Sequence, residues 1–400
     1  MNILKQPLYE VMFALVGCLA VHGTWAAEPL APIQQVEIGK HRELLVNGKP
    51  FFPIMSFAQE PRTFATLRSY GINTFCGNHG GKPVAKVFCD AAQAAGGYAM
   101  PHIDATGKGH PALLTYVQQD EPDMGIQKGK PALTAEEMVK RYQAAKAADN
   151  TRPVFQNLTS YFMVGPSWST AKPEAQQAYY SVVVGAGDIL AFDIYPIYGW
   201  NEDKQLTWVA DGVTQLAKYA GPNKPIFAFI ETAKGSQWIS YEKQKDVKPE
   251  HIRAEVWMAI IRGATGIAYF THAWRPTFKE FAPQGEALTE MTRVNGQIAK
   301  LSAAILDEPA KASVSIKLRG DAGDLAGEVL ARASEGNLYL FTNNLDMDGR
   351  SGKATIMVPG LKKGAVIEVV DENRTLSADD GGFTDAFAAL AVHIYRMKLP

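Results

Sequence analysis

The feature that most constrains the fold is an eightfold alternation between short apolar runs and stretches of helical periodicity. Each run is rich in β-branched or aromatic residues and ends at a polar or glycine-containing loop. Such runs are typical of buried parallel strands, and the spacing between them is typical of helices that cover a sheet. The expected strands are residues 51–57, 72–76, 98–103, 116–119, 154–157, 189–194, 226–230 and 266–270. The expected helices are residues 61–70, 84–95, 135–148, 174–184, 205–219, 251–262 and 286–305.

Repeated strand–helix units fold either into an open doubly wound sheet or into a closed barrel. Eight strands within roughly 250 residues favour closure, so the sequence predicts an α/β protein with a (β/α)8 TIM barrel over residues 51–306. The third helix is missing from the pattern, because residues 104–115 offer only about one helical turn. Ahead of the barrel, a β-hairpin arm is expected over residues 28–50.

The pattern changes after residue 306. Short runs separated by turn residues replace the helical periodicity, and several of them alternate apolar with polar residues, as in residues 337–342 and 392–397. A period of two indicates strands with one buried face and one exposed face. Residues 307–400 are therefore predicted to form a C-terminal antiparallel β-sandwich that packs on the barrel.

The charge balance argues against highly charged partners. The 400-residue chain is 20% charged with a formal net charge of -1, which gives no overall attraction to a phosphate backbone or to anionic lipid. Nucleic acid is therefore not an expected partner, whereas a local basic cleft for an acidic polymer is compatible with a neutral total. No apolar stretch approaches the roughly 20 residues that span a bilayer, so no transmembrane segment is expected.

The N-terminal residues resemble an export signal. An apolar stretch at residues 11–21 is followed by the small residues Ala26 and Ala27. The pattern predicts residues 1–27 as a signal peptide and the mature chain as exported, either periplasmic or secreted. A second interpretation is a lipoprotein signal, in which Cys18 becomes the acylated first residue.

Two cysteines, Cys76 and Cys89, follow the predicted signal. In an exported protein they can form a disulfide, but a strand end and the following helix do not guarantee the bonding geometry. The sequence leaves two possibilities, one disulfide or two buried free thiols. No CxxC pair or compact cysteine and histidine cluster is present, and no nucleotide-binding loop, so neither a metal nor a cofactor is expected.

Polar and aromatic side chains gather at the C-terminal ends of the expected strands. In a closed parallel barrel these ends surround one pocket, which is where barrel enzymes place their functional residues. The strand interiors are apolar, as in residues 226–230, so the polarity is concentrated where the pocket is expected. The candidate substrate-binding residues at these ends are Asn78, His102, Asp120, Asn157, Asp193, Tyr195 and Trp274.

Two glutamates are prominent among the strand ends. Glu121 follows the fourth strand in YVQQDEP, and Glu231 follows the seventh in IFAFIET. Cleavage of a glycosidic bond needs one carboxylic acid to protonate the leaving oxygen and a second carboxylate to attack the anomeric carbon or to activate water. Carboxyl groups about 5–5.5 Å apart give retention of configuration, and about 6.5–9.5 Å gives inversion. Because strands four and seven present both tips at one mouth, the pair predicts a glycoside hydrolase.

Residues 51–305 resemble the large clan of retaining glycoside hydrolases that have a (β/α)8 barrel and catalytic glutamates on strands four and seven. The NGKPFF sequence, the HPALL to DEP segment and the C-terminal sandwich are all similar to exported members. The resemblance implies that Glu121 is the acid/base and Glu231 the nucleophile, acting on a β-linked oligo- or polysaccharide. Asp120 departs from the asparagine that many members carry there, which affects the expected contact with the substrate 2-hydroxyl.

The resemblance also suggests roles for the other strand-end residues. Tyr195 is expected to donate its phenol to Glu231, as a strand-six tyrosine often does in similar enzymes. Trp274 offers a face on which a pyranose can stack, and Trp200 and Trp238 are candidate subsite residues in the loops. The remaining candidates are expected to bind hydroxyl groups or neighbouring carboxylates.

Other interpretations are open at this stage. A carbohydrate-binding barrel without catalysis would keep the aromatic residues but would not need both glutamates. A metal-dependent barrel hydrolase would use the strand-end histidines with Asp104 or Asp193 as ligands. In purely structural terms, Glu121 suits a helix N-terminus, and Tyr195 and Trp274 suit a core.

Overall fold

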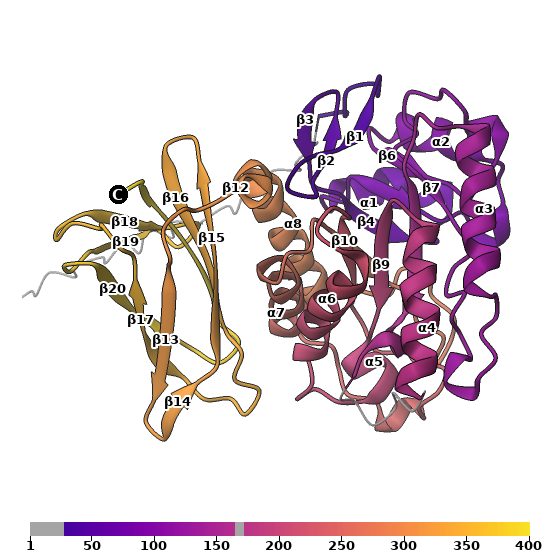
Figure 1. Ribbon diagram of the computed structural model, residues 1–400. Helices are drawn as coiled ribbons and strands as arrows, with labels where there is room; N and C mark the ends of the chain where they lie inside the picture. The colour runs from indigo at the N-terminus through magenta and orange to yellow at the C-terminus, as the bar shows by residue number, and fades with distance from the viewer. Residues whose placement is uncertain (1–27, 165–171) are drawn as a thin grey trace, which may run out of the picture.

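The computed structural model describes residues 28–164 and 172–400, which form two domains lying side by side (Figure 1). The larger domain is an eight-stranded parallel barrel covered by helices, and the smaller one consists of antiparallel sheets. The predicted fold class, a TIM barrel with a C-terminal β domain, is confirmed. The predicted signal peptide, with Cys18, lies outside the described residues.

The barrel strands follow one another in chain order around the cylinder. All strand pairs within the sheet are parallel, and β11 returns to pair with β4. Isolated parallel bridges, Ala99 with Leu113 and His102 with Val117, close the ring between β6 and β7. The strands are β4 (Ile54–Phe57), β5 (Thr74–Cys76), β6 (Tyr98–Met100), β7 (Tyr116–Val117), β8 (Val154–Thr159), β9 (Ile189–Asp193), β10 (Ile226–Glu231) and β11 (Gly266–Phe270).

The helices begin where the sequence carries start signals. Thr134 caps α3 by accepting a hydrogen bond from the Glu137 N–H at 3.1 Å, and prolines occupy the first positions of α4 and α7. In place of the missing third helix there is only a 3-10 turn, Ala105–Gly107. The helices are α1 (Phe64–Ser69), α2 (Ala85–Ala94), α3 (Ala135–Ala148), α4 (Pro173–Val183), α5 (Pro196–Trp200), α6 (Thr207–Ala220), α7 (Pro249–Ile261) and α8 (Gly285–Leu306).

Side chains on each barrel strand alternate between two cores. On β10, Ala228 and Ile230 pack outward against the helices, whereas Phe227 and Phe229 fill the barrel interior. Such two-sided burial explains why the strands read as continuous apolar runs. The interior is packed along its length, so a substrate can bind only beyond the strand ends.

A three-stranded antiparallel sheet covers the N-terminal mouth of the barrel. It consists of β1 (Val36–Ile38), β2 (Leu44–Val46) and β3 (Lys49–Phe51), of which the first two correspond to the predicted hairpin. Apolar side chains of this sheet join the interior core of the barrel. Figure 1 shows the sheet at the end of the barrel opposite α5, which leaves the C-terminal mouth for function.

The C-terminal domain packs its two sheets around a separate apolar core. One sheet has the order β12-β15-β16-β21-β18-β19 and the other β14-β13-β17-β20. Helix α7 joins the domains, since Trp257 stacks on Phe341 with 5.7 Å between ring centroids. The strands are β12 (Glu308–Pro309), β13 (Ser315–Gly320), β14 (Gly323–Leu325), β15 (Gly327–Ser334), β16 (Asn337–Asn344), β17 (Gly352–Met357), β18 (Val366–Val369), β19 (Arg374–Ser377), β20 (Gly382–Phe387) and β21 (Val392–Lys398).

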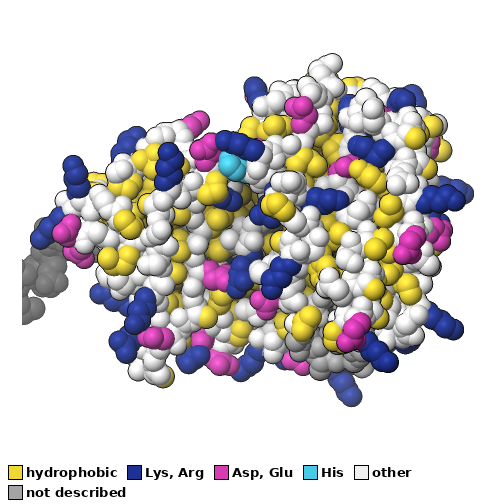
Figure 2. Space-filling model, in the orientation of Figure 1, with side chains coloured by type: hydrophobic (Ala, Val, Ile, Leu, Met, Phe, Trp, Pro, Cys, Tyr) yellow, Lys and Arg dark blue, Asp and Glu magenta, His cyan; other side chains and the backbone are white. Residues whose placement is uncertain are grey.

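The structure decides between a disulfide and two free thiols for Cys76 and Cys89. Cys76 on β5 and Cys89 on α2 are both buried and free, and burial raises the pKa of the Cys89 thiol to about 12. Figure 2 shows acidic and basic side chains interspersed over the visible face of both domains. Within the described ranges, no helix is long and apolar enough to cross a membrane.

Candidate active site

Two pockets open at the C-terminal ends of the barrel strands. The Trp274 pocket has a volume of about 480 Å³, and the Trp238 pocket about 310 Å³. Both fall in the range of roughly 300–1,000 Å³ that is usual for small-molecule sites. The Trp274 pocket is lined by residues that include Phe57, Asn78, His102, Asp120, His272 and Trp274. The Trp238 pocket is lined by residues that include Glu121, Tyr161, Asp193, Tyr195, Trp200 and Trp238.

A cluster of three carboxyl groups connects the two pockets. Asp120 and Glu121 follow β7 and line different pockets, and Asp193 at the end of β9 lines the same pocket as Glu121. Asn157 on β8 lies between them, because its Nδ2 donates to Oδ1 of Asp120 at 3.0 Å and is 3.3 Å from Oδ1 of Asp193. The structure therefore brings together four of the predicted site residues.

Glu121 and Asp193 behave as one acid. Burial is the main cause that raises the pKa of Glu121 to about 7. Burial, followed by the charge of Glu121, holds the pKa of Asp193 well above its ordinary value. The side-chain interaction between the two carboxyl groups lowers the pKa of Glu121 and raises the pKa of Asp193, so Asp193 is the group that holds its proton more tightly. We refer to these two residues as the acid pair.

Asp120 is the member of the cluster best placed to carry negative charge. Burial raises its pKa, but the hydrogen bond from Asn157 and the nearby imidazole of His102 act in the opposite direction. An amide donor aimed at a carboxylate stabilises the ionised form. The cluster thus places Asp120, whose ionised form the Asn157 amide favours, beside an acid whose pKa lies near neutral pH, and acid-assisted nucleophilic attack needs both kinds of group.

The backbone at Glu121 has a conformation that is unusual for a residue with a side chain. Its φ is +44°, in the left-handed region, where non-glycine residues are destabilised by roughly 1–2 kcal/mol. The following segment is held by Asp123, which accepts hydrogen bonds from the Thr159 N–H at 2.9 Å and the Tyr180 hydroxyl at 2.6 Å. Strained residues of this kind concentrate at functional sites. Asp123 was missed as a positioning residue, although it is the last acid of the DEPD sequence.

Asn78 and His102 line the Trp274 pocket, but the Asn78 amide is already engaged. Its Oδ1 accepts a hydrogen bond from the His102 N–H at 2.8 Å, and its Nδ2 donates to the Pro83 carbonyl at 2.6 Å. Asn78 therefore holds the wall of the pocket in place, and its amide is engaged within the protein and not directed at a substrate hydroxyl group. Burial lowers the pKa of His102 and so favours its neutral ring, whereas the nearby Asp120 acts in the opposite direction.

The two predicted aromatic residues lie in different pockets. Tyr195 lines the Trp238 pocket, and its ring packs on Phe270 at 4.8 Å. Burial and then the charges of Asp193, Glu121 and Asp120 raise the pKa of Tyr195, which lies beside the carboxylate cluster, whereas the sequence suggested Glu231 as its partner. Trp274 is 42% exposed and lies beside Phe278, with 4.9 Å between ring centroids.

Glu231 does not line either pocket. It is 0% exposed, and its carboxylate accepts hydrogen bonds from the backbone N–H groups of Ile197 at 2.9 Å and Tyr198 at 2.5 Å. Both N–H groups belong to the first turn of α5, so Glu231 fixes this short helix against the end of β10. A nucleophile must reach the substrate, and the position of Glu231 therefore counts against the predicted role.

A second buried glutamate, Glu255 on α7, faces Glu231. Glu255 is fully buried, and no donor among the described residues meets its carboxyl oxygens in hydrogen-bonding geometry. Burial and then the charge of Glu231 hold its pKa well above the ordinary value, and burial raises the pKa of Glu231 to about 7. Glu255 was missed from the sequence. The sequence signal that could have found it is a single acid among the buried residues of α7, a helix that is buried on nearly every face.

The Glu231–Glu255 pair should make stability fall as the pH rises. Because both pKa values are raised in the folded state, the stabilisation is complete in acid and is lost as the pH passes through about 7. Glu255→Gln supplies an amide donor to Glu231 and removes one of the two raised acids, so the loss of stability between the two pH values should become smaller. Urea unfolding at pH 5 and pH 9 measures the free energy of unfolding of each variant, and Glu37→Gln, at an exposed position, is the control. An unchanged pH dependence in Glu255→Gln would refute this account of the pair.

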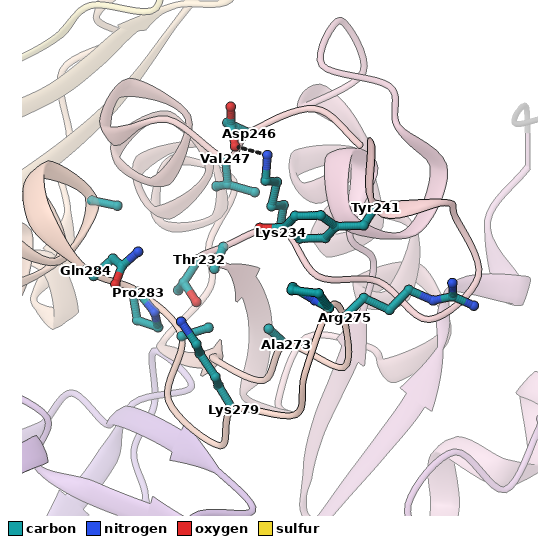
Figure 3. A pocket seen from close by; sticks show the side chains of 14 residues that line it. Thr232, Lys234, Tyr241, Asp246, Val247, Ala273, Arg275, Lys279, Pro283 and Gln284 are labelled. Carbon is teal, nitrogen blue, oxygen red and sulfur yellow. Dashed lines mark ion pairs between the residues drawn. The ribbon is translucent and has the colours of Figure 1, made fainter. Parts of the chain in front are cut away.

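A third pocket is lined by the loops that follow β10 and β11 (Figure 3). It has a volume of about 190 Å³. Lys234 forms an ion pair with Asp246 at 2.9 Å and lies over the ring of Tyr241, and Figure 3 shows Arg275 pointing away from this pair. The carboxylate that lines this pocket is thus tied to a lysine. The pocket lacks the two free carboxyl groups that glycosidic cleavage requires.

The described residues also bear on the metal-dependent alternative. Within residues 28–164 and 172–400, no group of three or more His, Cys, Asp or Glu side chains is placed to hold a metal ion. His79, His102 and His272 all line the Trp274 pocket, but they are not part of a group that could hold a metal ion. The described part of the chain therefore offers no candidate metal centre for that alternative.

Comparison with known proteins supports the architecture. A solved structure described as a glycoside hydrolase has a TM-score of 0.55 and 12% identity, covering 94% of this chain and 98% of its own. A protein from Bacteroides fragilis described as an α-galactosidase or melibiase has a TM-score of 0.54 and 12% identity, covering 89% and 80%. At this identity the likeness shows a shared fold, and it confirms the predicted resemblance at that level. No protein-family model and no curated protein matches the sequence.

Proposed function

We propose that the protein is a glycoside hydrolase that acts by a retaining double displacement at the carboxylate cluster. The observation that carries the proposal is the position of Asn157, whose Nδ2 lies 3.0 Å from Oδ1 of Asp120 and 3.3 Å from Oδ1 of Asp193. The shared donor holds Asp120 next to Asp193, the partner of Glu121, and carboxyl groups held close together suit a retaining mechanism. The fold shared with a glycoside hydrolase supports the same reaction class.

In the first step, Asp120 attacks the anomeric carbon of the sugar. The acid pair transfers its proton to the glycosidic oxygen, the bond between that oxygen and the anomeric carbon breaks, and an ester forms with Asp120. The leaving sugar departs as an alcohol. Glu121 suits the proton transfer because its pKa of about 7 lies near neutral pH.

In the second step, the acid pair acts as a base. It removes a proton from water, the water oxygen attacks the anomeric carbon, and the ester bond to Asp120 breaks. Two inversions at the same carbon leave the configuration unchanged. Asp120 returns as a carboxylate and the acid pair regains its proton, so both are ready for another turnover.

Two arguments bear on the linkage of the substrate, and they point in opposite directions. The resemblance seen in the sequence favours a β-linked sugar, whereas the similar structure from Bacteroides fragilis is described as an α-galactosidase. Aryl α- and β-glycosides of glucose, galactose, mannose and xylose separate these alternatives. The same panel asks whether the protein hydrolyses glycosides at all.

For the active glycoside, proton NMR in the first minutes should show product with the anomeric configuration of the substrate. Preparations of Asp120→Asn, purified in parallel, control for contaminating hydrolases. A product of opposite configuration would contradict the retaining mechanism. A panel that is bound but not cleaved would favour the carbohydrate-binding protein, and a panel neither bound nor cleaved would reject the proposed function.

We also propose that the protein is exported. The support is the apolar N-terminal stretch followed by Ala26 and Ala27. Expression of the full sequence in a bacterial host, followed by N-terminal mass analysis of the periplasmic fraction, should find a mature chain that begins near Glu28. A lipid-modified Cys18 would instead support the lipoprotein interpretation, and an intact N-terminus in the cytoplasm would refute export.

A further inference from the structure

Exposed aromatic residues lie at both outer margins of the site. Trp238, which lines one pocket, is 70% exposed, and Trp274, which lines the other, is 42% exposed. Phe278, packed beside Trp274, is 52% exposed. Exposed aromatic side chains around a cavity mark binding surfaces, and indole rings suit the apolar faces of pyranoses. The site therefore has a stacking surface on each side of the carboxylate cluster.

The carboxyl groups are divided between the pockets according to their proposed roles. Asp120 lines only the Trp274 pocket, and the acid pair lines only the Trp238 pocket. A nucleophile must contact the sugar whose anomeric carbon reacts, and an acid must contact the oxygen of the leaving sugar. The division thus assigns a direction to the bound chain.

We infer that the enzyme cleaves within a carbohydrate chain and binds sugars on both sides of the broken bond. The reacting sugar occupies the Trp274 pocket, and the leaving sugar occupies the Trp238 pocket and stacks on Trp238. This inference rests on the proposed glycoside hydrolase activity and specifies its substrate as an oligo- or polysaccharide. An enzyme that removes single terminal sugars closes off the pocket of the reacting sugar, whereas here the Trp274 pocket opens to solvent beside the exposed Trp274 and Phe278.

The test separates the two pockets by the size of the leaving group. A glycosyl fluoride carries no leaving sugar, so it uses the Trp274 pocket but not the Trp238 pocket. The probes are the fluoride of the sugar identified by the aryl panel and its reduced oligosaccharides, from dimer to hexamer. Trp238→Ala should lower kcat/KM for the hexamer about tenfold more than for the fluoride, the loss expected for one stacking contact. Trp274→Ala should lower kcat/KM for both substrates.

Product lengths provide a second readout. Wild-type enzyme should convert the hexamer first into intermediate oligomers, whereas release of monomers alone from one end would overturn internal cleavage. An equal loss for hexamer and fluoride in Trp238→Ala would overturn the assignment of that pocket. Val366→Ala, an exposed position on β18 of the other domain, is the control for a substitution of an exposed apolar residue. If wild-type enzyme cleaves neither probe, the proposed function itself fails, which is a different outcome.

Discussion

Replacement of Asp120 by asparagine should lower kcat for glycoside hydrolysis by about 10⁴-fold or more, the scale seen when a catalytic nucleophile is removed. The amide has nearly the shape of the carboxylate and its oxygen can still accept the hydrogen bond from Asn157, but it cannot form the ester. Substrate binding should persist, so calorimetry with the best aryl glycoside should give a similar Kd. Loss of binding and of turnover together would instead indicate a binding role for Asp120.

Glu231→Gln is the matched comparison, because sequence reasoning assigns the nucleophile to this residue. The amide can accept only one of the two N–H hydrogen bonds that the carboxylate receives from α5. Leaving one of these groups without its partner should destabilise the fold by about 1–3 kcal/mol. At a temperature where the variant is folded, kcat should stay within about tenfold of wild type. Complete loss of kcat with an intact circular dichroism spectrum would contradict the assignment.

Replacement of Glu121 by glutamine should have the second-largest effect, about 10²–10⁴-fold on kcat for natural glycosides. The substitution removes the ionisable member of the acid pair whose pKa is about 7. The effect should be much smaller for aryl glycosides with acidic phenols, since such leaving groups depart without a proton. Kinetics across a series of phenols measure the difference, and Glu136→Gln on the exposed face of α3 is the control. An equal loss for all leaving groups would exclude an acid role.

The same residue determines how activity depends on pH. Glu121 itself must carry a proton in the first step, so kcat/KM should fall as the pH rises through its pKa of about 7, while Asp193 keeps its proton to higher pH. It should also fall in acid, where Asp120 takes up a proton at a pKa that burial has raised above the ordinary value. The two limbs belong to coupled groups and report on the cluster as a whole. Glu121→Gln should alter the alkaline limb and leave the acid limb in place.

The barrel could be predicted because its signals are local. Apolar runs such as residues 226–230 are buried on both faces, and the helices between them show their own period, so each element is visible within a short window. The strands of the C-terminal domain were harder to predict from the sequence. The strands Gly323–Leu325, Arg374–Ser377 and Gly382–Phe387 carry weak alternation and depend on pairing with distant partners.

The roles within the site could be predicted only in part. Strand order correctly brings Asp120, Glu121, Asn157 and Asp193 to one mouth, because adjacent parallel strands end side by side. It could not show that α5 turns back over β10 and places its first N–H groups on Glu231. It also could not show that the two neighbouring acids at the end of β7 line different pockets. Asp120 therefore looked like a departure from a family pattern, whereas its surroundings make it the candidate nucleophile.

The most direct test of this account is covalent trapping of the nucleophile. A 2-deoxy-2-fluoro glycosyl fluoride slows both steps of a retaining reaction but slows hydrolysis of the ester more, so the glycosyl-enzyme accumulates. After protease digestion, mass spectrometry should locate the added sugar on Asp120, and Asp120→Asn should take up none. A sugar found on Glu231 would contradict the proposed site and restore the role that sequence reasoning assigned to that residue.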